Sequence, residues 1–75
     1  MARSKETELS ILQLELKKRQ KICGSCERKL YKYEKANERV FNAVSQDEIE
    51  EIELELETQK LEIEILKAKI KELLR

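Results

Sequence analysis

Apolar residues recur every three or four positions along the second half of the chain. Ile49 and Ile52 begin this series, Gln59 fills its one polar gap, and the series ends at Leu73. A spacing that alternates between three and four residues is the heptad pattern of helices that pack along a single seam. The pattern therefore predicts a helix over about residues 46–74, with one face buried against a neighbouring helix.

The first half of the chain carries the same spacing from Leu9 to Val44, which predicts a long helix over about residues 5–43. One glycine, Gly24, falls inside this helix and allows two interpretations. Gly24 either ends the helix as a C-terminal cap, which gives a three-helix arrangement, or it costs a continuous helix about 1 kcal/mol relative to Ala. The heptad phase is unchanged across Gly24, so we favour the continuous helix and keep the three-helix arrangement as the alternative.

The phase of the seam resets between the two predicted helices. Ser45 is followed three residues later by Glu48, which is a capping signal for a new helix, so we expect a turn at about residues 43–46. Phe41 is expected to close the seam beside this turn. The resulting fold is all-α: a single domain formed by an antiparallel helical hairpin of the coiled-coil type. Aligning the seams about the turn pairs Cys26 with Ile63, Leu30 with Gln59, and Leu16 with Leu73.

A second set of apolar residues lies on the side of each helix opposite to the seam. The hairpin leaves this set uncovered, and the same alignment leaves residues 4–14 without a partner in the second helix. Burying an aliphatic side chain contributes about 1.5–3 kcal/mol, so we predict a homodimer of hairpins that forms roughly a four-helix bundle. The residues predicted for the dimer interface are Leu9, Ile11, Leu12, Leu14, Leu54, Leu61, Ile65 and Ala68.

Composition and charge support a helical protein that associates. The chain has 75 residues, 43% of them charged, with no Pro and one Gly, which is typical of long helices in a single small domain. The net charge is zero, but residues 1–40 carry eleven basic and six acidic side chains whereas residues 41–75 carry five and ten. The two halves should attract each other within a chain or between copies. The absence of a secretory signal and of a membrane-spanning run leads us to expect a cytoplasmic protein.

Cys23 and Cys26 form a Cys-x-x-Cys pair in a chain that has no His. One chain supplies two of the four ligands of a tetrahedral zinc site, so two chains would complete one intersubunit site. The motif resembles the zinc hook at the coiled-coil apex of the double-strand-break repair ATPases, in which one Cys-x-x-Cys from each of two chains holds one zinc. That family usually has Pro after the first Cys, where this chain has Gly24. The resemblance implies zinc at Cys23 and Cys26.

Other roles for the two thiols stay open. Both cysteines occupy seam positions, where a small core thiol is the simplest interpretation and no cofactor is expected. A disulfide between them is another possibility. A redox site is a third, but it needs a low-pKa thiolate at a helix N-terminus, and no second catalytic group accompanies the pair.

The sequence therefore predicts a binding function rather than catalysis, because it has no His and no convergent acid–base pair. We expect a small self-associating protein–protein interaction module, a regulatory adaptor or inhibitor that acts by binding a protein partner. One alternative is a nucleic-acid-associated factor that uses the basic surface of residues 17–39, which hold nine Lys and Arg. The other is a thiol/redox or zinc-hook-type dimerisation protein at Cys23 and Cys26.

Overall fold

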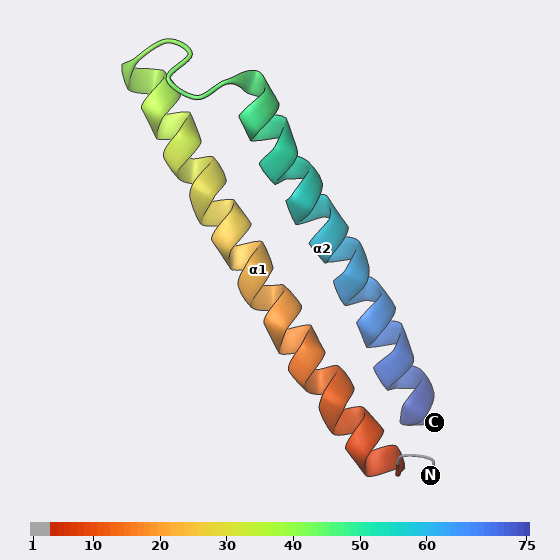
Figure 1. Cartoon of the computed structure of the whole chain (residues 1–75). Helices are drawn as coiled ribbons and strands as arrows, with labels where there is room; N and C mark the ends of the chain where they lie inside the picture. Colours follow the sequence, from red (N-terminus) through yellow and green to blue (C-terminus); the bar gives the residue numbers. More distant parts are fainter. Residues whose placement is uncertain (1–3) are drawn as a thin grey trace.

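The structure is a computed structural model that describes residues 4–75, and it consists of two helices packed as a hairpin (Figure 1). Helix α1 covers Lys5–Arg39 and helix α2 covers Gln46–Leu73, and the described residues contain no strand. The turn lies at one end of the rod, and the start of α1 and the end of α2 lie at the other (Figure 1). The prediction of an all-α helical hairpin is confirmed.

Helix α1 begins at a serine cap and continues through the glycine. The Oγ of Ser4 accepts a hydrogen bond from the backbone N–H of Thr7 at 3.1 Å, which satisfies a free donor of the first turn. The helix runs without interruption past Gly24, so the chain does not adopt the alternative three-helix arrangement. Seam packing on both sides of Gly24 outweighs the roughly 1 kcal/mol that a glycine costs inside a helix.

The first helix ends at Arg39, a few residues before the predicted end near residue 43. Val40 has an extended backbone (φ −134°) and Asn42 has a left-handed one (φ 57°), a conformation that Asn adopts more readily than most residues. The Oδ1 of Asn37 accepts a hydrogen bond from the N–H of Val44 at 2.8 Å. This bond holds the turn against the last part of α1. Asn37 therefore uses its side chain to bind the turn and not to contact α2.

The core of the hairpin is a single line of side chains between the two helices. The most buried residues are Leu66, Cys26, Gln59 and Cys23, which are 3%, 5%, 5% and 8% exposed. The molecule measures 56 × 21 × 14 Å, and its smallest extent is close to the diameter of one helix. The hairpin is therefore one layer thick, and each helix is covered by protein on one side only.

The register of the hairpin differs from the predicted alignment by about one heptad. The prediction placed Gln59 opposite Leu30, but in the structure Gln59 Oε1 accepts a hydrogen bond from Arg19 Nη1 at 3.0 Å. Arg19 and Leu30 are separated by about 16 Å along a helix, too far for one arginine side chain to span. The predicted pairs were therefore wrong, although the same faces of the two helices meet.

The change of register shortens the predicted overhang at the termini. Leu12 and Leu73 line the same groove, so α2 reaches a part of α1 that was expected to have no partner. Leu9 and Leu12 are partly buried as a result. The expectation that residues 4–14 project as a whole beyond α2 was wrong.

The turn end of the seam is open rather than closed. Phe41 was expected to cover this end, but its side chain is 89% exposed and Val40 is exposed as well. Because α1 stops at Arg39, both residues belong to the turn and lie beyond the packed part of the two helices.

Candidate interaction surfaces

The two cysteines lie in the seam between the helices. Cys23 and Cys26 are free thiols, and both are buried. A register shifted by one heptad from the predicted alignment pairs them with Gln59 and Leu56 of α2, which agrees with the proximity of Glu55 to Cys26. Burial raises the pKa of the Cys26 thiol above its ordinary value, and the nearby carboxylate of Glu55 raises it further. Burial therefore shields the Cys26 thiol from solvent and disfavours the thiolate form that a nucleophile requires.

The same burial bears on the zinc expectation at Cys23 and Cys26. Within residues 4–75, no three His, Cys, Asp or Glu side chains are grouped closely enough to hold a metal ion. A shared intersubunit site would require both thiols to leave the seam and face a second chain, so the hairpin itself would have to open. In the single hairpin, both thiols are core side chains.

A polar network crosses the seam beside the thiols. Arg19 donates to Gln59 Oε1 at 3.0 Å, and Gln59 Nε2 donates in turn to Glu55 Oε1 at 3.0 Å. A second guanidinium nitrogen of Arg19 lies 3.6 Å from Glu15 Oε1. The buried Nε of Arg19 has no partner. Two polar residues in facing seams are the sequence signal for such a pair, because each can satisfy the hydrogen-bonding groups of the other.

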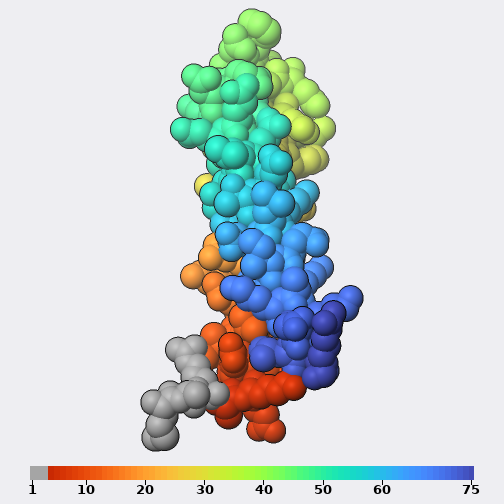
Figure 2. All heavy atoms as spheres, turned by 90° about the vertical axis from the view of Figure 1, so that its right-hand side faces the viewer, coloured from red at the N-terminus to blue at the C-terminus, as the bar shows by residue number. Residues whose placement is uncertain are grey.

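The side of α2 opposite to the seam carries exposed apolar side chains. Leu54, Leu61 and Ile65 are 65%, 60% and 48% exposed, and Ala68 is exposed beside them. We call these four residues the α2 apolar stripe. Figure 2 views the molecule from the α2 side, where no other element of the described chain lies over this helix. The stripe comprises half of the predicted dimer interface, and the other exposed members, Ile11 and Leu14, belong to α1.

Acidic residues flank the α2 apolar stripe. Asp47, Glu50 and Glu51 line a shallow groove together with Leu54, the first residue of the stripe. The surface is thus amphipathic, with an apolar line edged by carboxylates. Neither helix of the described chain combines the length and the apolar content needed to cross a bilayer.

The side of α1 opposite to the seam is strongly basic between residues 17 and 39. We call the exposed cations of this side the α1 basic face. Two acidic residues adjoin it: Glu27 lies next to Arg28, and Glu38 forms an ion pair with Lys35. Its members are Lys17, Lys18, Lys21, Arg28, Lys32, Lys35 and Arg39.

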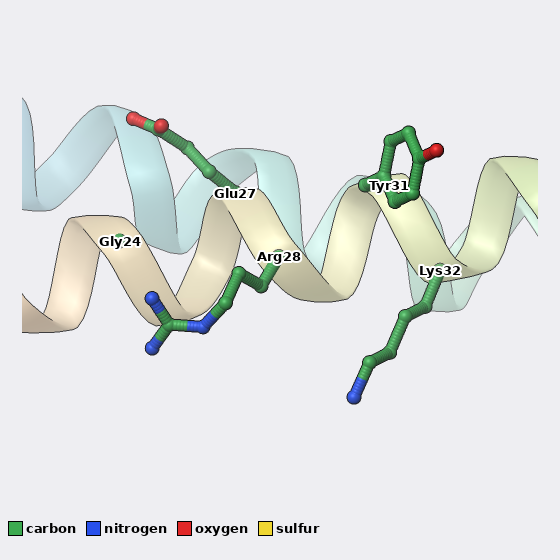
Figure 3. Close-up of a pocket in the computed structure, with 5 residues that line it drawn as sticks. All are labelled: Gly24, Glu27, Arg28, Tyr31 and Lys32. Atoms are coloured by element: carbon green, nitrogen blue, oxygen red, sulfur yellow. The ribbon is translucent and has the colours of Figure 1, made fainter.

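A shallow hollow lies at the centre of the α1 basic face. Gly24, Glu27, Arg28, Tyr31 and Lys32 line it, and all five belong to α1 (Figure 3). Arg28 and Lys32 project to one side of the helix whereas Glu27 and Tyr31 project to the other (Figure 3). The guanidinium of Arg28 folds back along α1, so that its Nη1 would lie 3.4 Å from a Cβ built on Gly24. The hollow is a groove on the surface of one helix and does not enclose a small molecule.

The basic and acidic surfaces do not neutralise each other within one hairpin. Each ion pair of the described residues joins two side chains that are three or four positions apart in the sequence, and none joins α1 to α2. The α1 basic face and the acidic edge of the α2 apolar stripe lie on opposite sides of the molecule. Both charged surfaces are therefore free to attract oppositely charged surfaces of other molecules.

Comparison with known proteins adds no family to these observations. No family model, curated protein or solved structure matches the chain. The function must therefore be argued from the two outer surfaces and the seam.

Proposed function

We propose that this protein is a small self-associating interaction module, a regulatory adaptor or inhibitor that presents helix faces to a protein partner and has no catalytic role. The observation that carries the proposal is the exposure of Leu54, Leu61 and Ile65 on a hairpin only one helix thick. A helix with apolar rows on two opposite sides needs a neighbour on each side. In one hairpin α2 has a neighbour on the seam side only.

The energy available from the α2 apolar stripe indicates a reversible association. Full burial of Leu or Ile contributes about 1.5–3 kcal/mol, and roughly half of that remains to be gained at side chains that are already partly covered. Six such side chains from two copies would contribute about 6 kcal/mol, which is comparable with the lower estimates for the loss of translational and rotational freedom. The α2 apolar stripe alone therefore supports only weak self-association, which needs a high protein concentration and which a competing partner can displace.

Sedimentation velocity over a range of protein concentrations tests the proposal. We expect the sedimentation coefficient to rise with concentration, and Leu61→Lys to abolish the rise by placing a charge in the middle of the stripe. Gln20→Lys introduces the same charge at an exposed position of α1 and serves as the matched control. A monomer at every concentration would refute self-association.

The α1 basic face favours a second candidate function, the binding of nucleic acid. Seven exposed cations follow one side of a single helix, and contacts of Lys and Arg with phosphates make binding depend strongly on salt. Fluorescence anisotropy with duplex DNA and RNA at two salt concentrations tests this function. Replacing Lys21 and Lys32 by Glu should remove binding, whereas the same change at Lys67 and Lys69 of α2 should not. If all variants bind the nucleic acid equally well, the α1 basic face is not the binding surface.

A further inference from the structure

The outer side of α2 has a symmetric pattern centred on Leu61. Leu54 and Ala68 lie one heptad before and after Leu61, so the three residues follow one line along the helix. One heptad further in each direction are Asp47 in the first turn and Arg75 directly beyond the helix end. The line therefore carries an acid at one end, a base at the other, and a large residue at its centre.

An antiparallel arrangement of two copies makes this line complementary to itself. With Leu61 at the centre, Asp47 would lie beside Arg75 of the partner subunit, and Leu54 would lie beside Ala68 of the partner subunit. The large Leu54 would then face the small Ala68 on either side of the Leu61 pair, which lets the two helices approach closely, and Ile65 would lie beside Glu57 of the partner subunit. On the flank, Glu51 lies beside Lys71 of the partner subunit, and only Glu50 beside Glu72 of the partner subunit is a repulsive pair.

A parallel arrangement of the same two surfaces would bring like charges together. Each residue would lie beside its own copy, so that Asp47 and Glu51 would both face identical carboxylates. Like charges in contact oppose association, and they also select against the wrong orientation. The charge pattern therefore distinguishes between the two directions, whereas the apolar residues alone do not.

We infer that a second copy of this chain covers the α2 apolar stripe in the antiparallel direction, with the two-fold axis at Leu61. This inference rests on the proposed self-association and specifies its geometry. The two α2 helices form the inside of the assembly and the two α1 helices form its outside. Both α1 basic faces, together with Ile11 and Leu14, point away from the dimer contact and stay available to another molecule.

Cysteine cross-linking tests the direction of pairing. In a Cys23→Ala/Cys26→Ala background, Leu61→Cys places two thiols at the axis, and mild oxidation should convert the protein to a covalent dimer. Leu54→Cys in the same background is the matched control, since an antiparallel pair separates the two thiols by about two heptads, on the order of 20 Å. Covalent dimers from Leu54→Cys as abundant as those from Leu61→Cys would overturn the antiparallel geometry.

A charge exchange tests the geometry with the native cysteines in place, in case the alanine background fails to fold. Glu51→Lys should weaken dimerisation about 3- to 10-fold, because it affects two symmetric contacts, and the added change Lys71→Glu should restore it. Sedimentation separates the two levels of the argument. A dimer without rescue by the second change would overturn the geometry alone, whereas a monomeric wild type would overturn the proposed function and the geometry together.

Discussion

Replacing Arg19 and Gln59 together by leucine should stabilise the hairpin and weaken its choice of register. Two registers one heptad apart bring the same apolar faces together, because a heptad pattern repeats after seven residues. The observed register joins Arg19 to Gln59 at 3.0 Å. The alternative separates these two residues by about 16 Å and leaves Gln59 opposite Leu30.

The single change Gln59→Leu should destabilise the protein by about 1 kcal/mol. It removes a hydrogen bond from a charged donor, which is worth about 1.5–3 kcal/mol, and a second bond to Glu55. The new leucine recovers roughly 2 kcal/mol by burial. The guanidinium of Arg19 keeps Glu15 at 3.6 Å and its side chain is 25% exposed, so it does not become fully unpaired.

The double change should instead raise the free energy of unfolding by about 1–3 kcal/mol over the wild type, since no buried polar group is left behind. Urea unfolding followed by circular dichroism, with Arg19→Leu completing the double-mutant cycle, measures both effects. If the effects of the two single changes simply add up to the effect of the double change, the Arg19–Gln59 pair contributes nothing.

The register itself can be measured through the native thiol of Cys26. In a Cys23→Ala background, Leu56→Cys should cross-link to Cys26 under mild oxidation, and Ile63→Cys, one heptad further along, should not. In the double leucine variant, the Ile63→Cys cross-link should appear. Equal cross-linking at residues 56 and 63 in the otherwise native chain would refute the argument that the polar pair selects the register.

Other predictions concern the seam, the glycine and the thiols. Leu66→Ala should lower the free energy of unfolding, measured in urea, by about 2–4 kcal/mol, because Leu66 is buried in the single hairpin. Leu61→Ala in dilute protein should change it by less than about 0.5 kcal/mol, because Leu61 is exposed there. Gly24→Ala should stabilise α1 by about 1 kcal/mol by thermal unfolding, because the new methyl group would meet only the movable end of Arg28. Iodoacetamide should modify Cys26 more slowly in the native protein than in urea. The raised pKa of this thiol stabilises the fold below pH 9.0, and the stabilisation should disappear as the pH rises through the raised value, which a comparison with Cys26→Ala would detect.

The sequence alone determined the elements of this fold and the faces that meet. Periodic apolar positions specify which side of each helix is buried, because an α-helix brings residues three and four apart onto one side. Ser45 caps α2 through a bond between its Oγ and the N–H of Glu48 at 3.2 Å, a local contact that is visible as a sequence motif. The exposure of Leu54, Leu61 and Ile65 follows from the same periodicity, since these residues lie opposite to the seam.

Only the tertiary structure decided the register, the end of the first helix and the surroundings of the thiols. A shift of seven residues preserves every match between the two seams, so periodicity cannot distinguish the two alignments. The choice depends on polar groups that are distant in sequence: Arg19 finds Gln59, and Asn37 turns to the backbone of Val44. In the structure that has these contacts, α1 ends at Arg39 and Phe41 lies exposed in the turn. The physical reason is that a buried polar group without a hydrogen-bond partner costs more free energy than moving an apolar side chain to a different neighbour. Only the folded chain shows which partners are within reach.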